Sequence, residues 1–245
     1  MEPNGLKYAG VDGCRKGWFL VSIDEHCLNF SFAIFGDIKT LWLTTQQCER
    51  ILIDIPIGLS NSKPRLCDVF ARKLLHTRGS SVFPTPTRNA VYASNYEDAK
   101  GINFKLSGKK ISQQAWNISR KIREVDEFLA ASHDAHGKIR ESHPEICFWA
   151  LAGGKPMAFP KKSEQGIKER LQLLQTHCQI AEAIFLEAKQ KYLRKDLALD
   201  DILDAIVLAI TAASPIETIG AIPEIPERDD RNIAMEIVYT NRYLN

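Results

Sequence analysis

Short apolar segments separated by polar turns fill the first 58 residues of the chain. Three of them, at 6–12, 18–23 and 28–35, follow one another closely, which predicts three consecutive antiparallel strands. Asp37 is a favourable N-cap for a following helix. The run RILIDIPIG at 50–58 is almost continuously apolar, as is typical of a central strand buried on both faces. This part of the chain predicts the order β-β-β-α-β.

The pattern changes between residues 59 and 138, where apolar residues recur at helical spacing. Ser112 is placed to cap the longest of these segments, QQAWNISRKIREVDEFLAA, which has one apolar face. A loop marked by prolines, SSVFPTPTR, precedes it. We interpret residues of about 59–138 as a mainly helical insertion rather than as an independent domain.

Four further elements are predicted downstream. RESHPEICFW, at 140–149, predicts a fifth strand, and Ser163 is placed to cap a long helix. Asp200 is a candidate cap for the apolar, buried helix DILDAIVLAITAAS, and IAMEIVY at 233–239 predicts an edge strand. The whole predicts one α/β domain over residues 1–245, with a mixed five-stranded sheet flanked by helices and the insertion between its fourth and fifth strands.

Composition adds a charge asymmetry to this outline. Residues 60–140 contain fifteen Lys and Arg against seven Asp and Glu, a net charge of +8, so the remainder carries −6. A basic segment beside an acidic framework would attract a polyanion such as nucleic acid. The alternative is that long amphipathic helices simply carry solvated Lys and Arg, and the sequence does not decide between the two.

The six cysteines are scattered, without a C-x-x-C pair or a zinc-like spacing of His and Cys. No secretory signal precedes Tyr8, and no apolar run approaches the roughly 20 residues that span a bilayer. We therefore expect a cytoplasmic protein with reduced thiols and no membrane partner. The oligomeric state stays open, a homodimer included.

The most informative positions are acidic residues spread over nearly the whole chain. Asp12 and Asp54 each end an apolar run, and Asp201 and Asp204 lie three apart at the start of the apolar helix. Residues three apart share a helix face, so two strand ends and one helix face would bring these carboxylates together. Such a convergence is best explained by a divalent cation.

Each acid also has a structural explanation. Asp12 precedes a glycine and so suits a turn, and Asp201 complements the dipole at the start of a helix. Asp54 and Asp204 lie within apolar segments, where an unpartnered carboxylate is costly, and we favour a metal for them. Glu145, in the tripeptide HPE, is either a further ligand or the partner of Arg88 or His143.

Several motifs resemble one family. They are VDGCRKGW, IDIPIGL, CDVFAR, SSVFPTPTR, ISQQAWNISRKIREVD, ESHPE, FPKKSEQGIKER and DDILDA. Together they are similar to a widespread domain of unknown function labelled predicted ribonuclease H-like nucleases, from about Tyr8 to Ser214. The resemblance implies a ribonuclease H-like fold with Asp12 as a bridging metal ligand. The DxxDA piece also resembles the last motif of Holliday-junction resolvases of this superfamily, in which both helix acids bind metal.

These observations predict a divalent-metal-dependent nuclease. Asp12, Asp54, Asp201 and Asp204 would bind Mg²⁺ or Mn²⁺, which prefer oxygen ligands, and Asp12, Asp54, Glu145 and Asp204 would be the catalytic acids. Two such ions could activate water and stabilise the leaving oxygen. Candidate contacts to phosphate are Arg15, Lys16, Arg88 and Lys161. The substrate, RNA, hybrid or structured DNA, is not determined.

Two other functions remain open. ATP-dependent phosphotransfer occurs on the same fold, although the chain contains one copy of it and no adenosine-type glycine motif. A non-catalytic nucleic-acid-binding module would bind oligonucleotides in a salt-sensitive manner without cleaving them.

Overall fold

The computed structural model describes residues 5–244, which divide into two compact units. The first unit consists of the chain up to Asp54, residues 137–220 and the end of the chain from Val238. The second consists of residues 55–136 and 221–237. Within residues 5–244, no helix is both long and apolar enough to cross a membrane.

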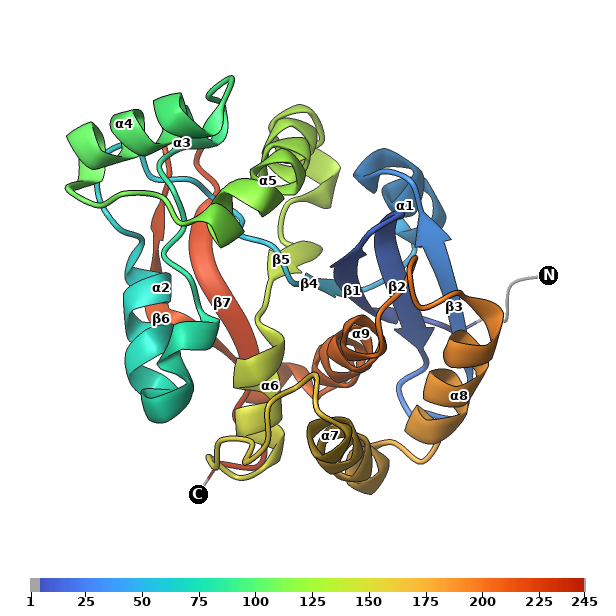
Figure 1. Cartoon of the computed structure of the whole chain (residues 1–245). Coiled ribbons are helices and arrows are strands. Elements are labelled where there is room, and N and C mark those ends of the chain that lie inside the picture. The colour runs from blue at the N-terminus through green and yellow to red at the C-terminus, as the bar shows by residue number, and fades with distance from the viewer. Residues whose placement is uncertain (1–4, 245) are drawn as a thin grey trace. The chain divides into compact units, whose positions relative to one another are not determined.

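A five-stranded mixed sheet with the order β3-β2-β1-β4-β5 forms the centre of the first unit (Figure 1). Its strands are β1 (Tyr8–Cys14), β2 (Gly17–Ile23), β3 (Phe30–Phe35), β4 (Arg50–Ile53) and β5 (Ile139–Glu141). The first three strands pair antiparallel, whereas β4 pairs parallel with both β1 and β5. The α/β class and the mixed five-stranded sheet predicted from the sequence are therefore confirmed.

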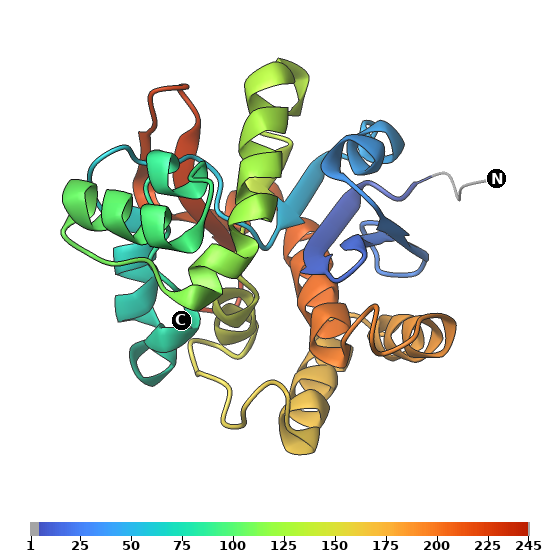
Figure 2. The same cartoon turned by 45° about the horizontal axis from the view of Figure 1, so that its top comes forward.

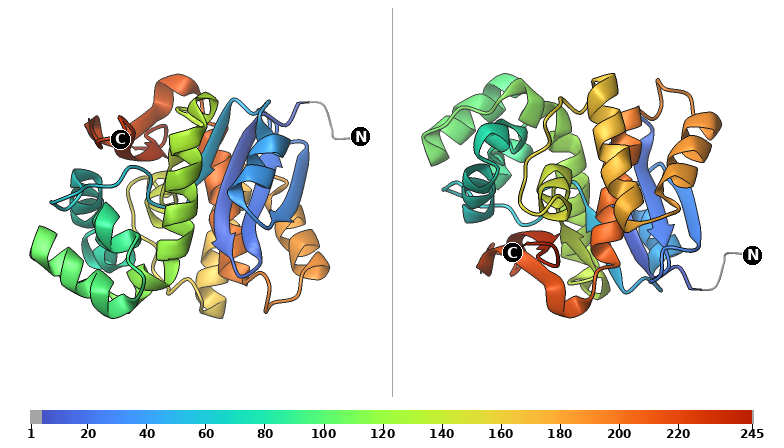
Figure 3. Two further views of the ribbon diagram at one scale, coloured as in Figure 1. Left: turned by 90° about the horizontal axis from the view of Figure 1, so that it is seen from above. Right: turned by 90° about the horizontal axis from the view of Figure 1, so that it is seen from below.

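Helices flank this sheet on both faces. They are α1 (Ile38–Thr45), α6 (Pro144–Leu151), α7 (Glu164–His177), α8 (Ala181–Lys191) and α9 (Leu199–Ala212). The apolar α9 runs along β1, β2 and β4, and α7 and α8 pack against α9 on the same side (Figure 3). Phe19, Val21 and Ile23 of β2 point toward these helices and form the main core with them, so α1 covers the opposite face.

The second unit contains the helices that follow β4 in the sequence, together with a β-hairpin (Figure 2). Its helices are α2 (Leu66–Leu74), α3 (Arg88–Val91), α4 (Tyr96–Ser107) and α5 (Gln113–Ala131). The hairpin strands are β6 (Ile219–Arg228) and β7 (Ala234–Thr240), of which residues 221–237 belong to this unit. The segment between β4 and β5 is thus mainly helical, as the sequence predicted.

Three predicted helix caps are confirmed. Asp37 Oδ1 accepts the N–H of Thr40 at 2.8 Å, Ser112 Oγ accepts that of Ala115 at 3.1 Å, and Ser163 Oγ accepts that of Gly166 at 3.0 Å. Each hydrogen bond satisfies a backbone N–H that the first turn of a helix leaves without a partner. Local sequence chemistry therefore defines these helix starts without help from tertiary packing.

Two other predictions were wrong. The fifth strand predicted at 140–149 ends at Glu141, and Pro144 begins α6. Proline suits the first position of a helix, and almost all of α6 is buried, so no periodic pattern marked it as helical. The predicted cap of α9 was also wrong, since the helix is capped at Ala198 and Asp200 lies within its first turn.

Helix α9 lies directly on the sheet at Gly10 in β1. A Cβ atom at this position would lie 2.1 Å from the Ala205 carbonyl oxygen and 2.3 Å from the Ala209 nitrogen. Both are backbone atoms of α9, so neither can move aside without displacing the helix. Arg50, at the start of β4, donates hydrogen bonds to the carbonyls of Ala212 and Ser214 at the other end of α9.

We expect Gly10→Ala to lower the free energy of unfolding by about 3 kcal/mol or more, the upper part of the range for overpacking a rigid core. Urea denaturation measures this. Gly101→Ala is the matched control, because Gly101 lies within α4 with no atom close to the added methyl group. It should raise the stability by about 1 kcal/mol through helix propensity. Equal stability of the two variants would contradict a tight contact at Gly10.

Candidate active site: a buried acid cluster

The sheet places Asp12 and Asp54 side by side. Val11 of β1 is in register with Ile53 of β4 in a parallel pair, and Asp12 and Asp54 follow these two residues. The N–H of Asp54 donates to the carbonyl of Val11 at 2.9 Å. Because the carboxyl ends of neighbouring parallel strands lie at the same edge of a sheet, both acids project from one edge of the first unit.

Helix α9 adds acidic residues from the facing layer. Side chains two apart in a strand share a face, so Asp12 lies on the same face of β1 as Gly10, against which α9 packs. Asp204 immediately precedes Ala205, whose carbonyl lies over Gly10. Asp200 is one turn earlier on the same side of α9. Asp12, Asp200 and Asp204 are all buried.

The electrostatics of these residues show that their carboxylates interact. The pKa of Asp12 is raised well above its ordinary value by burial, and further by the negative charges of Asp54, Asp204 and Asp201. Burial likewise raises the pKa of Asp54 and of Asp201. It raises the pKa of Asp204 to about 7, with a contribution from Asp54. These four acids, which the sequence spreads over nearly two hundred positions, therefore form what we call the acid cluster.

One ammonium group lies within the acid cluster. Lys161 Nζ is 2.7 Å from Asp204 Oδ2 and 3.5 Å from Asp200 Oδ2. The charges of Asp204, Asp12 and Asp54 raise the pKa of Lys161 against the opposing effect of burial, so this lysine stays protonated at neutral pH. A single positive charge offsets only part of the negative charge that four carboxylates would carry.

The loop that carries Lys161 is held by several side chains. Glu169 accepts the N–H groups of Ala158 and Phe159 at 2.7 and 3.1 Å. The buried Arg170 donates to the Phe159 carbonyl at 3.2 Å. The carbonyl of Pro160 packs against Gly166, where a Cβ atom would lie only 2.0 Å from the carbonyl oxygen. The backbone on both sides of Lys161 is therefore fixed to the start of α7.

Glu145, predicted as a catalytic acid, lies in the first turn of α6 and contacts Arg170. Its Oε2 accepts a hydrogen bond from Arg170 Nη2 at 2.8 Å, and both side chains are buried. The guanidinium also lies 5.3 Å from the ring centre of Phe148. Glu145 thus joins the acid cluster indirectly, through the arginine that holds the Lys161 loop. This contact involves neither Arg88 nor His143, the two partners that the sequence suggested for Glu145.

The other predicted phosphate contacts are exposed or have other partners. Arg15 is exposed after β1, and Lys16 pairs with Asp196 at 2.9 Å. Arg88 belongs to the second unit and pairs with three acids there. They are Asp126, Asp229 and Asp230, at 3.0, 2.5 and 3.0 Å. Lys161 is the one member of this set that the structure brings to the acid cluster.

The donors of the acid cluster are chemically suited to Mg²⁺ or Mn²⁺, which bind carboxylate oxygens. In the part of the chain that the structure describes, however, no group of three or more His, Cys, Asp and Glu side chains is arranged to hold a metal ion as it stands. The Lys161 ammonium lies against Asp204. A divalent ion bound to Asp204 would therefore compete with this ammonium.

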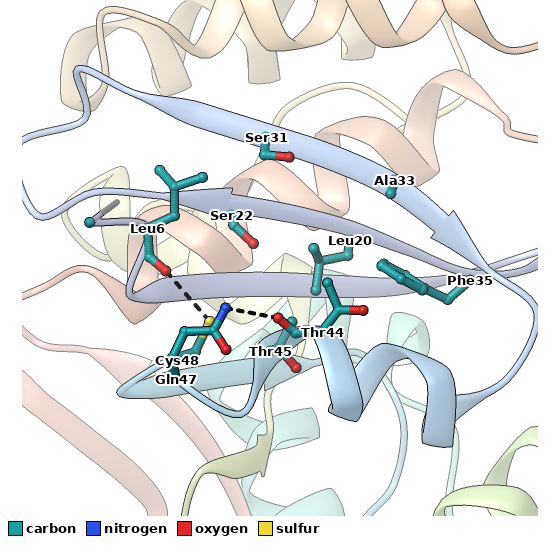
Figure 4. Close-up of a pocket in the computed structure, with 11 residues that line it drawn as sticks. Leu6, Leu20, Ser22, Ser31, Ala33, Phe35, Thr44, Thr45, Gln47 and Cys48 are labelled. Atoms are coloured by element: carbon teal, nitrogen blue, oxygen red, sulfur yellow. Dashed lines mark hydrogen bonds between the residues drawn. The ribbon is translucent and has the colours of Figure 1, made fainter. Parts of the chain in front are cut away.

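A cavity of about 220 Å³ lies on the α1 side of the sheet and is uncharged (Figure 4). Several polar groups of the residues that line it form hydrogen bonds within the protein. Gln47 donates to the Thr44 carbonyl at 2.9 Å, Thr45 Oγ1 donates to the Leu41 carbonyl at 2.9 Å, and the Cys48 thiol lies 3.7 Å from the Leu6 carbonyl. Apart from the Cys48 thiol, its lining contains no titratable side chain, so we place the candidate site at the acid cluster.

The sequence did not point to Glu169 or Arg170 as residues of the site. It also did not indicate that His143 lies close enough to Asp54 to lower the pKa of that carboxyl. A signal existed for the first two, because both lie in the motif FPKKSEQGIKER that also contains Lys161. Their spacing from Lys161 spans a loop and a helix turn, and no regular period relates them. Their role follows only from the folded loop.

A comparison with family models found that residues 10–231 match a family described as a protein of unknown function (DUF429). No curated protein and no solved structure matches the chain.

The raised pKa values predict how stability depends on pH. A carboxyl with a pKa near 7 when folded and 3.8 when unfolded, as for Asp204, binds its proton more tightly in the folded state. The free energy of unfolding therefore falls as pH rises from about 4 to about 7, by at most about 1.4 kcal/mol per pH unit for one carboxyl. Above about pH 7 the contribution of this carboxyl is constant. Asp12, Asp54 and Asp201 act in the same direction.

Urea denaturation in EDTA at pH 5 to 8 measures this dependence. We expect Asp204→Asn to lose less stability over this range than the wild type. Asp134→Asn, a change at an exposed acid, should behave like the wild type. His177, whose pKa burial lowers, acts in the opposite sense but is common to all three proteins. An identical pH slope for Asp204→Asn and wild type would show that Asp204 titrates normally.

Proposed function

The chain belongs to the DUF429 family of proteins of unknown function, and we propose that it is a divalent-metal-dependent hydrolase of phosphodiester bonds in nucleic acid. The observation that carries the proposal is the excess of acidic side chains at the acid cluster, of which Asp12 and Asp204 are buried. Burial and mutual repulsion raise the pKa of Asp12, Asp54, Asp201 and Asp204. Retaining such a set is costly for folding, and binding a cation would recover that cost.

The fold supports this proposal. Three antiparallel strands followed by two parallel ones are the arrangement expected of a ribonuclease H-like fold. So are acids near the end of β1, directly after β4 and on a helix that packs against β1. We infer that fold from the strand order and from the position of the acids. A shared fold does not by itself imply a shared activity, so the activity depends on the acid cluster.

In this proposal Asp12, Asp54 and Asp204 would hold Mg²⁺ or Mn²⁺. Asp201 would support them with one oxygen, since its Oδ2 already accepts the N–H of Ala198 at 3.1 Å. When bound, the metal would supply an activated water and a positive charge for the leaving oxygen. Glu145 would act as a positioning residue, because it holds Arg170 and through it the loop of Lys161.

Lys161 has two roles in this proposal. Without metal, its ammonium partly neutralises Asp204 and so lowers the cost of burying the acids. Its side chain is 42% exposed and flexible, so it can leave Asp204 while its backbone stays fixed. Once released, the ammonium is a cation beside the cluster that would attract a phosphate group.

A second candidate function rests on the same lysine. An ammonium against Asp204 would also suit a cluster that is permanently neutralised and binds no metal. The protein would then be a non-catalytic nucleic-acid-binding module. Metal binding distinguishes the two functions.

We expect Mn²⁺ to bind the wild type, as measured by titration calorimetry or electron paramagnetic resonance, and to bind Lys161→Met about tenfold more tightly. That factor corresponds to about 1.4 kcal/mol, a modest value for removing a competing positive charge. Lys168→Met removes an exposed charge of α7 and should leave the affinity unchanged. If Mn²⁺ binds neither the wild type nor Lys161→Met, the non-catalytic alternative is supported.

Cleavage tests the reaction itself. Labelled single-stranded RNA, hybrid and branched DNA are incubated with the protein in Mn²⁺, and the products are resolved by gel. Asp12→Asn and Asp204→Asn keep the side-chain shape and should each lower the rate at least a hundredfold, as is usual for the loss of a metal-binding or catalytic group. Asp134→Asn serves as the active control. Cleavage that persists in Asp12→Asn would place the activity elsewhere.

A further inference from the structure

A second polar cavity lies in the second unit, beside the loop that contains the motif SSVFPTPTR. Its volume is about 80 Å³. The residues that matter for its chemistry are Lys63, Thr85, Thr87, Asn103, Lys109 and Lys110. None of them belongs to the acid cluster, which is formed wholly by the first unit.

Two hydroxyl groups in this cavity are buried without a hydrogen-bond partner in the described chain. They are Oγ1 of Thr85 and Oγ1 of Thr87, whose residues are 8% and 2% exposed. Their backbone N–H groups are occupied, by Asp68 Oδ2 at 2.8 Å and by Asn103 Oδ1 at 2.8 Å respectively. A buried hydroxyl without a partner is costly and rare in folded proteins. Both residues line this cavity, and a ligand bound there would supply the missing hydrogen-bond partner.

The charges around the cavity favour an anionic ligand. Lys109 and Lys110 are exposed, and neither ammonium forms an ion pair within residues 5–244. Ile111 and the N-cap Ser112 separate them from the 19-residue helix α5, whose first turn contains no acidic residue. The start of a helix carries a partial positive charge, so two lysines there are unfavourable unless an anion lies near. Two acids that contact residues of the cavity, through Thr85 and Lys63, form ion pairs, while Glu227 Oε2 is buried without a hydrogen-bond partner.

These paired acids are Asp68 and Glu227. Asp68 Oδ1 lies 2.6 Å from Arg65 Nη2, and Glu227 Oε1 lies 2.6 Å from Lys63 Nζ. The cavity is thus left with the positive charges of Lys109 and Lys110, the positive end of α5, and two hydroxyl donors. This combination of backbone dipole, ammonium groups and hydroxyls is characteristic of sites that bind phosphate.

The size of the cavity limits the ligand. Its volume of about 80 Å³ is about a third of the 220 Å³ of the cavity on the α1 side of the sheet. A space of this size suits one tetrahedral oxyanion. We propose that this cavity binds a single phosphoryl group of a phosphate ester, with Thr85 and Thr87 donating to its oxygens and Lys109 and Lys110 neutralising it. The proposal is independent of the acid cluster and holds whether or not that cluster binds metal.

Thr87→Val and Thr85→Val provide the sharpest test, because the two possible roles of the hydroxyls predict different results. Replacing an unpartnered buried hydroxyl with a methyl group should leave the ligand-free protein as stable as the wild type or more so. The same change should weaken phosphate binding at least tenfold, since a hydrogen bond to a charged group is lost. A hydroxyl that serves the fold alone would show the reverse, lower stability and no change in phosphate binding.

The measurement is the melting temperature of the full chain in EDTA as inorganic phosphate is titrated at constant ionic strength. We expect phosphate to stabilise the wild type and chloride to have no such effect. Lys109→Gln combined with Lys110→Gln should abolish the stabilisation. Lys105→Gln, at an exposed position of α4 that does not line the cavity, should leave it intact. No stabilisation of the wild type, or equal stabilisation of Thr87→Val, would overturn the proposal.

Competition experiments distinguish the sources of the phosphoryl group. A 5′-phosphorylated mononucleotide and a short oligonucleotide without a terminal phosphate are each tested for displacement of inorganic phosphate. Displacement by the oligonucleotide would assign the site to phosphodiesters of a nucleic-acid chain, and displacement by the mononucleotide alone would assign it to a terminal phosphate. Both support the proposal. If neither compound competes, the site does not recognise a phosphate ester and the proposal fails.

Discussion

The backbone contact between α9 and β1 at Gly10 is the constraint on which the first unit depends. A residue with any side chain at position 10 would meet the carbonyl of Ala205 and the nitrogen of Ala209. Only glycine lets the helix lie directly on the strand. Because Asp12 follows Gly10 on the same strand face and Asp204 precedes Ala205 on the helix, the convergence of acids is a consequence of this packing. Arg50, bound to the carbonyls of Ala212 and Ser214, fixes the other end of α9.

This packing brings together charges that would separate if they were free. The pKa of Asp12 rises because burial and three neighbouring acids oppose its ionisation, and Lys161 offsets only part of that repulsion. The loop of Lys161 is held by Glu169 and Arg170, while its long side chain remains partly exposed. A fixed backbone with a movable ammonium suits a site at which another cation takes the place of the lysine.

Net charge along the sequence proved a poor guide to where positive charge is available. Residues 60–140 carry +8 in sum, but their buried arginines are neutralised within the second unit. Arg65 pairs with Asp68, and Arg88 pairs with Asp126. Lys109 and Lys110, by contrast, lie exposed shortly before α5. Burial converts some cations into structural partners and leaves others free to bind ligands.

The sequence by itself determined the α/β class, the order of the first strands, the caps at Asp37, Ser112 and Ser163, and the four acids worth examining. These features depend on local periodicity and on hydrogen bonds between residues close in the chain. It could not determine that residues 144–151 are helical, because a fully buried segment has no periodic pattern. Nor could it pair Glu145 with Arg170 or Lys161 with Asp204, 25 and 43 positions apart. Such pairs are decided by how helices pack on the sheet, and only the tertiary structure brings their charges within a few ångströms of each other.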